Sequence, residues 1–195
     1  MVDGGEKSDA LMASGKAHEA ALDPSALSLQ PTLEGLTLLL RPLRDEDFEA
    51  LYAAASDPLI WELHPEPTRY QRDVFRKFFN DAMASKGAFA VIEKSSGKII
   101  GSSRYYDVNL EKHQLKIGYT FLARSHWGGD TNREMKRLML DHAFQAFDSA
   151  LFEIGENNHR SRRAIEKIGG RLVGRSEFKA GTHVVYQIDS PGPRS

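Results

Sequence analysis

The chain has 195 residues, of which 41% are hydrophobic and 27% are charged, as is ordinary for a globular domain. It contains no cysteine, which excludes disulfides, a thiolate nucleophile and cysteine-ligated zinc. The net charge of −1 divides into −4 over residues 1–34 and +3 over residues 35–195, a basic excess that suits a small polyanion but not nucleic acid. No stretch resembles a membrane span or a signal peptide, so we expect a cytoplasmic protein with no membrane partner.

Residues 1–34 are rich in alanine, serine, glycine and acidic groups, and Pro24 and Pro31 interrupt them. This composition predicts a mostly disordered N-terminal extension. A lid or a dimer arm is the alternative, so a homodimer stays open. Residues 35–190 then form the domain, and residues 191–195 form a loose tail.

The first half of the domain begins with a predicted strand at 36–40, whose continuous apolar character indicates burial on both faces. An amphipathic helix over 45–56 follows, and Pro58 ends it. A long loop over 57–69 leads to a second helix, for which Thr68 and Gln71 are a predicted capping-box pair.

The second half begins with predicted strands at 89–93 and 99–106, joined as a hairpin. The remaining elements are, in chain order, a strand at 115–122, a helix to about 148, a strand at 151–154, a helix at 162–168, and strands at 170–177 and 183–188. The order predicts an α/β (α+β) fold with a mixed, mostly antiparallel central sheet of about seven strands and helices on both faces.

A glycine-containing turn at 124–132 lies between a predicted strand and a predicted helix start. The first N–H groups of a helix have no partners inside it and face its positive dipole end, so this turn favours an anionic ligand. The nearby cations Arg124, Arg133, Lys136 and Arg137 support this interpretation. The structural alternative is a T-x-x-E capping box of Thr131 and Glu134, which would occupy the same donors.

Two motifs resemble those of the GCN5-related N-acetyltransferase (GNAT) superfamily. The first is W-G-G-D at 127–130 with Glu134 on the following helix, and the second is N-H-R-S at 158–161 followed by E-K-I-G at 166–169. The likeness covers about 36 to 188 and is similar to the branch that acetylates ribosomal-protein N-termini and small amines. Asp130 departs from the family's glycine or alanine, and Ser125 from its glutamine or arginine.

The resemblance implies acetyl-CoA as co-substrate. It implies that Asn158 holds the pantetheine arm, that the Ser161 hydroxyl protonates the departing thiolate, and that a backbone N–H near Phe121 and Leu122 binds the thioester oxygen. The residues expected to contact the cofactor are Phe121, Leu122, Trp127, Gly128, Gly129, Asp130, Thr131, Asn132, Asn158 and Ser161. A helix cap is the alternative role of Asn158 or Ser161.

An attacking amine must be neutral, which calls for a base. The candidates are a water held by Glu93 or Tyr119, and then Glu62 or His64 of the long loop. Lys116 replaces the glutamate that the branch often has before its I-G-Y strand. The histidines lie on different predicted elements, so we expect no metal site.

The long loop is also the expected acceptor entrance, together with the turn near 178–183. Trp61, Glu62 and His64 are the expected contacts, and Glu62 and Glu66 would attract a cationic amine. The expected function is transfer of an acetyl group from acetyl-CoA, by direct attack, to a small-molecule amine or a protein N-terminus. The alternatives are the same fold with another acyl-CoA and a non-catalytic acyl-CoA-binding or regulatory module.

Overall fold

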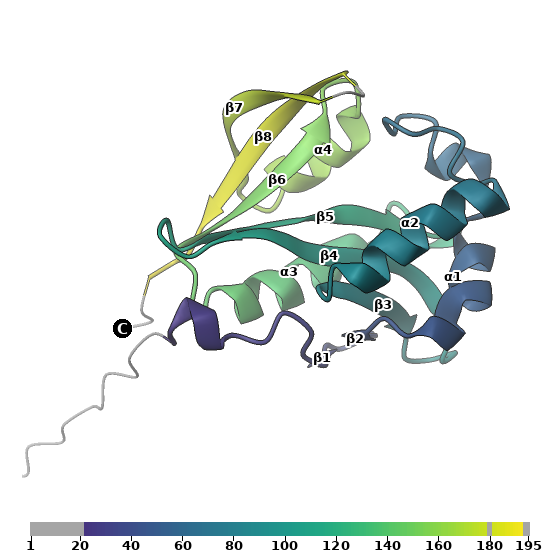
Figure 1. Ribbon diagram of the computed structural model, residues 1–195, viewed down its shortest axis with the longest axis horizontal. Helices are drawn as coiled ribbons and strands as arrows, with labels where there is room; N and C mark the ends of the chain where they lie inside the picture. Colours follow the sequence, from purple (N-terminus) through teal and green to yellow (C-terminus); the bar gives the residue numbers. More distant parts are fainter. Residues whose placement is uncertain (1–21, 179–180, 193–195) are drawn as a thin grey trace, which may run out of the picture.

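The computed structural model describes residues 22–178 and 181–192 (Figure 1). Within them, eight strands form one sheet in the order β1-β2-β3-β4-β5-β6-β8-β7. The strands are β1 (Leu33–Glu34), β2 (Leu38–Pro42), β3 (Ala88–Glu93), β4 (Ile99–Asn109), β5 (Gln114–Leu122), β6 (Ser149–Gly155), β7 (Arg171–Phe178) and β8 (Gly181–Asp189). The α-helices are α1 (Phe48–Ala55), α2 (Arg72–Ala84), α3 (Thr131–Ala143) and α4 (His159–Glu166). The predicted α/β class and mostly antiparallel sheet are confirmed.

The sheet opens between β5 and β6, its one parallel pair among the described strands. Their pairing joins only residues 114–116 to residues 149–151, and Figure 1 shows the two strands diverging beyond it. On its other edge β5 carries a bulge, because Ser102 of β4 faces Phe121 whereas Arg104 faces Gly118. A bulge accommodates one extra residue and bends its strand. Tyr119 occupies the bulge with a φ of +51°.

Two apolar clusters cover the two faces of the sheet. Met135 and Met139 of α3 are fully buried in the first cluster, with residues of β2 to β6 and β8. Phe75 and Phe78 of α2 belong to the second, which also includes buried residues of α1. The predicted placement of helices on both faces is therefore correct. Side chains next to the bulge point to both faces, because Leu122 belongs to the first cluster and Phe121 to the second.

Three expectations need correction. The first strand begins at Leu38 rather than residue 36, and Leu36 is 87% exposed. Leu39 is only half-buried, because the burial along β2 alternates. The expected capping box of α2 does not form: the Thr68 hydroxyl bonds the carboxylate of Glu66, and α2 begins at Arg72.

The segment 22–34, expected to be disordered, contacts the domain. Leu27 is buried in the α3-face cluster. The Leu22 N–H donates to the Gln145 carbonyl at 2.9 Å, and Gln30 Nε2 donates to the Ala88 carbonyl at 3.1 Å. The expectation for residues 1–21 lies outside the described residues. No helix of the described chain is long and apolar enough to cross a membrane.

Candidate functional site

The N-terminus of α3 presents free backbone donors. The first helical hydrogen bond runs from the Glu134 N–H to the Asp130 carbonyl at 2.8 Å, so the preceding N–H groups have no acceptor inside the helix. Within the described chain no side chain caps them. Gly128 has a φ of +79°, and a Cβ at Gly128 or Gly129 would meet no described atom within 4 Å. The predicted anion-binding turn therefore has both open donors and open space.

Glu134 is not part of a capping box. Its carboxylate accepts the Thr37 N–H at 2.8 Å, the Thr37 hydroxyl at 2.5 Å and the Leu38 N–H at 3.3 Å. Glu134 thus ties the beginning of β2 to α3, through contacts that span more than 90 residues of sequence. Because this carboxylate is occupied, the structural alternative for the donors at the start of α3 is removed.

Asp130, the departure from the family motif, turns toward solvent. Its side chain is 80% exposed, and Oδ1 lies 2.5 Å from Nη2 of Arg133. The carboxylate therefore does not occupy the space in front of the helix. Its charge still lies near the helix start, where the helix dipole favours it.

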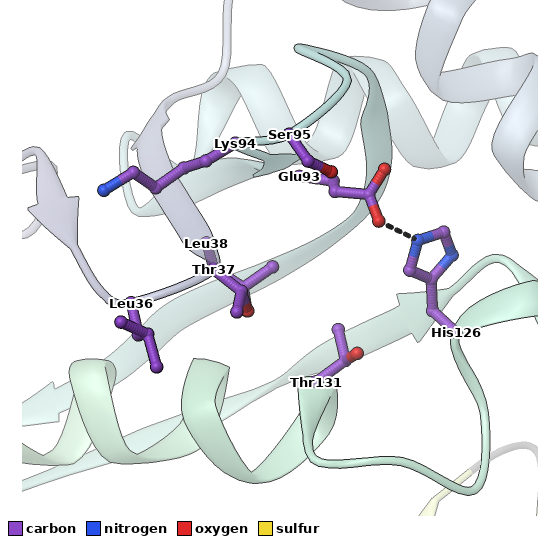
Figure 2. Close-up of a pocket in the computed structure, with 8 residues that line it drawn as sticks. All are labelled: Leu36, Thr37, Leu38, Glu93, Lys94, Ser95, His126 and Thr131. Carbon is purple, nitrogen blue, oxygen red and sulfur yellow. Dashed lines mark hydrogen bonds and ion pairs between the residues drawn. The ribbon is translucent and has the colours of Figure 1, made fainter.

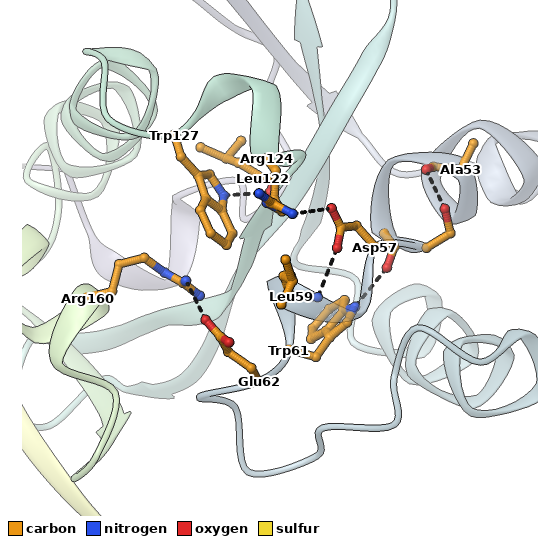
Figure 3. Close-up of polar contacts among 11 residues, drawn as sticks. Ala53, Asp57, Leu59, Trp61, Glu62, Leu122, Arg124, Trp127 and Arg160 are labelled. Atoms are coloured by element: carbon orange, nitrogen blue, oxygen red, sulfur yellow. Dashed lines mark hydrogen bonds and ion pairs between the residues drawn. The ribbon is translucent and has the colours of Figure 1, made fainter.

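The backbone of Leu122 faces the opening between β5 and β6. The Ala123 N–H donates to the Ile100 carbonyl on β4 at 2.8 Å, and successive residues of a strand direct their backbone groups to opposite edges. The Leu122 carbonyl accepts the indole N–H of Trp127 at 2.9 Å, as Figure 3 shows. The Leu122 N–H faces the same opening, whereas Phe121 pairs with β4 and buries its ring.

The second motif forms the start of α4. Oδ1 of Asn158 accepts the Ser161 N–H at 3.1 Å, so Asn158 is the N-cap and the helix begins at His159 rather than near Arg162. Ser161 is therefore in the first helical turn, with its hydroxyl outside the cap. Arg160 belongs to the same motif. Its guanidinium lies 3.8 Å from the Trp127 ring centroid and donates to the Ile60 carbonyl at 3.2 Å. Arg160 joins the two motifs across the opening (Figure 3).

Glu93 lies away from this opening. Its carboxylate accepts from the Ser96 hydroxyl at 2.6 Å and lies 3.2 Å from Nε2 of His126. It borders a hollow of about 450 Å³ that extends to Thr131 at the start of α3 (Figure 2). The strand order puts β2 and β3 on one side of β5 and puts β6 on the other. The hollow is lined by Leu36, Thr37, Leu38, Glu93, Lys94, Ser95, His126 and Thr131.

The structure does not bring Glu93 and Tyr119 together. Arg104 faces Gly118, next to Tyr119, and also faces Ala88 on β3. Glu93 lies five residues further along β3, which is roughly 16 Å at 3.3 Å per residue. Of these two candidates, only Tyr119 is at the strand that borders the opening.

A carboxylate that the motifs did not indicate reaches β5 from β6. Glu153 is 10% exposed in its side chain and accepts from Lys116 Nζ at 3.0 Å. It also accepts from the Tyr106 hydroxyl at 3.4 Å, and the Tyr106 ring lies 5.0 Å from that of Tyr119. Burial first, and then Glu153, raise the pKa of Tyr106. Lys116, which replaces the family's glutamate, is thus paired with a glutamate on the neighbouring strand.

The loop over 57–69 is placed differently from the expectation. Trp61 is 1% exposed, its indole N–H donates to the Ala55 carbonyl at 2.8 Å, and its ring packs 5.1 Å from that of Phe121. Its side chain thus belongs to the core, and its contact with an acceptor stays a prediction. Glu62 lies 3.8 Å from Arg160 Nη1. Burial, and then Arg69, lower the pKa of His64 to about 3, so its imidazole is neutral.

Lys136 is another correction. Expected among the cations around the glycine turn, it is 4% exposed and points into the α3 face of the sheet. Its Nζ donates to Thr120 Oγ1 at 2.6 Å and lies 3.4 Å from Ser103 Oγ. Burial lowers its pKa to about 7. In the described chain no group of three or more histidine or acidic side chains could hold a metal ion.

Comparison with known proteins matches residues 37–171 to the model of the acetyltransferase (GNAT) domain family. A GCN5-related N-acetyltransferase from Brucella melitensis has a similar structure, with a TM-score of 0.75 at 22% identity over 83% of this chain and 79% of that one. Mycobacterium smegmatis RimJ in complex with CoA-disulfide is similar with a TM-score of 0.70 at 19% identity, over 85% of this chain and 91% of that one. Vibrio cholerae spermidine N-acetyltransferase, in complex with CoA and spermine, is similar with a TM-score of 0.63 at 16% identity, over 79% of this chain and 96% of that one.

Proposed function

Since this chain belongs to the GNAT acetyltransferase family, we propose that it moves the acetyl group of acetyl-CoA to a primary amine by direct attack. The observation that carries the proposal is the opening between β5 and β6 beside the uncapped start of α3. A helix start with free backbone donors and an unpaired strand edge lie together there. This arrangement supports binding of a phosphorylated, elongated co-substrate whose reactive end lies along β5.

We assign the cofactor contacts to backbone groups first. The N–H groups of residues 129–132 would hold the pyrophosphate, because they are free and Gly128 leaves the approach open. Acetyl-CoA supplies a thioester carbonyl, on which negative charge develops during attack. The Leu122 N–H would stabilise that charge, because it is fixed by the strand and faces the opening.

Glu153 is the proposed acceptor of the amine proton. An amine on a lysine-like chain has a pKa of about 10.4 and needs a base at neutral pH, whereas an α-amine near 8 needs it less. Lys116 and Tyr106 hold the Glu153 carboxylate on the side of β5 where Tyr119 lies. Ser161, in the first turn of α4, is the proposed donor to the departing thiolate.

Glu153→Gln tests the proton-acceptor role. We expect kcat/KM at pH 7 to fall by about a hundredfold to ten-thousandfold, the range of general-base contributions, and the deficit to shrink at high pH as the amine loses its proton unaided. Glu177→Gln, which changes an exposed carboxylate on β7, is the matched control. An equal loss in both variants, or a deficit independent of pH, would remove Glu153 from this role.

The alternative is a non-catalytic acyl-CoA-binding module, which an Asp130 carboxylate facing the phosphates would favour. Asp130 points to solvent, and Glu153 is a base candidate, so we prefer the enzyme. Calorimetric titration with acetyl-CoA, combined with a screen of amines for release of free CoA, separates the two. Binding together with amine-dependent release supports the enzyme. Binding without release for any amine supports the module, and absence of binding contradicts both.

A further inference from the structure

Arg104 is a buried arginine whose donors are not satisfied. The residue is 6% exposed, and its Nε and Nη2 are buried without a hydrogen-bond partner among the described residues. Its guanidinium stacks on the ring of Tyr119, with 4.1 Å from Cζ to the centroid. A ring face attracts the cation but does not accept these in-plane N–H groups. Buried donors are nearly always paired in folded proteins, so this group requires an explanation.

A second cation, the half-buried Arg69, lies beside it, and its Nη1 lies 3.1 Å from Nδ1 of His64. The Arg69 guanidinium, from the loop before α2, lies 4.7 Å from the centroid of Phe78, and Arg104 lies 5.8 Å from the same ring. Burial lowers the pKa of both groups, that of Arg69 to about 10. Two positive charges thus lie around one aromatic side chain on the α2 face of the sheet.

The described chain supplies no close counter-charge. Across residues 22–178 and 181–192, neither guanidinium lies within 4.0 Å of a carboxylate oxygen, in contrast to arginines such as Arg41, which pairs with Asp47 at 2.7 Å. Glu66 instead bonds the N–H and hydroxyl of Thr68. Asp81 of α2 is exposed and acts on the arginines only at longer range. Burying like charges is costly unless an anion joins them.

The two arginines lie next to the proposed site of reaction. Tyr119, which carries the stacked Arg104, is three residues before Leu122, or about 10 Å along the strand. The ring of Tyr119 also contacts the ring of Tyr106, whose hydroxyl donates to the proposed base Glu153. A small molecule could therefore place an amine near Glu153 and an anionic group near Arg104.

We propose that Arg104 and Arg69 bind the carboxylate of the acceptor, so that the substrate is an amine of the amino-acid class rather than a polyamine. This inference rests on the proposed acetyl transfer and names its substrate class. A carboxylate fits because it accepts two parallel N–H bonds from one guanidinium. This proposal departs from the sequence-based expectation of a cationic acceptor held by Glu62 and Glu66. Glu62 lies 3.8 Å from Arg160, and Glu66 bonds the Thr68 hydroxyl.

The first experiment compares matched acceptors. Free amino acids, the corresponding amino-acid amides and spermidine are each supplied with acetyl-CoA, and release of free CoA is measured. We expect kcat/KM to be about tenfold to a hundredfold higher for the acids than for their amides, the range for a hydrogen bond to a charged group. Arg104→Lys and Arg69→Gln should each reduce kcat/KM for the acid by about tenfold and change that for the amide by less than twofold.

Arg76→Gln is the control for removal of a cation. Arg76 is an exposed arginine of α2 that stacks on Phe48, so it matches the chemistry outside the pair. The variant should keep the preference for acids. Equal loss in this variant and in Arg69→Gln would show a general charge effect and would overturn the inference.

The second experiment reads binding without turnover. Protein labelled with ¹⁵N is titrated with N-acetyl amino acids, with their neutral amides and with inorganic phosphate, while the arginine Nε–H signals are followed by NMR. We expect the carboxylate probes to shift the Arg104 signal and the amides to leave it unchanged. A shift with phosphate alone, or with no probe, would overturn the assignment to a carboxylate.

The two proposals fail in distinguishable ways. Efficient acetylation of amides or spermidine, with no preference for acids, overturns the carboxylate site and leaves acetyl transfer intact. Absence of acetyl-CoA binding overturns the proposed function. A carboxylate-dependent shift of the Arg104 signal would then still support an anion site on this face.

Discussion

Two buried cations lie on opposite faces of the β4–β5 pair, and their surroundings differ. Lys136 reaches the α3 face and finds the hydroxyls of Thr120 and Ser103. Arg104 lies on the α2 face, with two buried nitrogens that have no acceptor among the residues that the structure describes. The difference teaches that burial of a charge does not by itself indicate a ligand. Lys136 has hydrogen-bond acceptors within the fold, whereas the described chain provides none for the buried Nε and Nη2 of Arg104.

The same contrast separates the two sides of the proposed site. On the cofactor side, the donors are backbone N–H groups at the start of α3, and a short stretch of sequence determines them. On the acceptor side, the groups come from β4, β6 and the loop before α2, which are far apart in the sequence. Changes on the first side should therefore affect acetyl-CoA, and changes on the second should affect the amine.

The largest expected effect is on the cofactor side. Gly128→Val should weaken acetyl-CoA binding more than a hundredfold, because the side chain would occupy the approach to the N–H groups and strain a residue with φ of +79°. Gly97→Val is the matched control, since Gly97 also has a positive φ of +68° with open space around it, but lies in the β3–β4 turn. Calorimetry with acetyl-CoA should show loss only in the first variant. Equal loss in both would place the cofactor elsewhere.

Lys136→Met should stabilise the protein by about 1–4 kcal/mol at pH 6, because it removes a buried charge from a site that has hydroxyl partners but no carboxylate. The ordinary amine pKa of 10.5 applies to the unfolded chain, and burial lowers it to about 7 in the folded chain. The unfolded state therefore binds the additional proton between these values, and wild-type stability rises with pH across that window.

The gain from Lys136→Met should accordingly be complete below pH 7 and decrease as the pH approaches 10.5. Denaturant unfolding at pH 6, 8 and 10 measures this trend. Lys94→Met, at an exposed lysine paired with Glu34, should show no comparable gain. A gain that does not change with pH would mean that the folded and unfolded chains bind the same number of protons, which would contradict the lowered pKa of Lys136.

The motif at the start of α4 allows a sharper division of roles. Asn158→Ala should cost about 1 kcal/mol of stability, as expected for an N-cap, because Asn158 accepts the Ser161 N–H. Ser161→Ala should leave stability nearly unchanged and lower kcat by about tenfold, with little change in acetyl-CoA affinity. Thermal unfolding and steady-state kinetics on both variants test this. An unchanged kcat in Ser161→Ala would remove its proposed role in catalysis.

The element order and the fold class could be predicted because they depend on local periodicity and turn residues. The start of α3 shows where that reasoning ends. Thr131 and Glu134 have the spacing of a capping box, yet Glu134 bonds Thr37, whose proximity only the folded sheet creates. Trp61 likewise seemed suited to a ligand-binding loop, but the loop folds its indole into the core.

The acceptor side could not be predicted because its pairs cross strands. Nothing near Glu153 in the sequence indicates that it contacts Lys116 and Tyr106. These contacts form only because β6 lies beside β5 in the folded sheet. Arg104 lies in the predicted strand over 99–106, but its lack of partners among the described residues appears only when every neighbour is placed. The cofactor motifs, in contrast, were visible because a helix start needs few residues to define it.

The smallest expected effect concerns Asp130. Its carboxylate is exposed and paired with Arg133, so solvent and the arginine screen it from any phosphate in front of the helix. Asp130→Gly should change the acetyl-CoA Kd by less than about fivefold, measured by calorimetry. Tightening by a hundredfold would show that the native loop impairs its own cofactor site and would favour the regulatory module.

The most direct test of the account is to follow the acetyl group itself. Acetyl-CoA labelled with ¹³C in its acetyl group is incubated with the protein and a mixture of free amino acids, amino-acid amides and spermidine, and the products are analysed by mass spectrometry. The account predicts label in an N-acetyl amino acid, free CoA in equal amount, and none on the protein. Release of CoA without any ¹³C-acetylated amine product, or label retained on the enzyme, would contradict direct transfer to an amine.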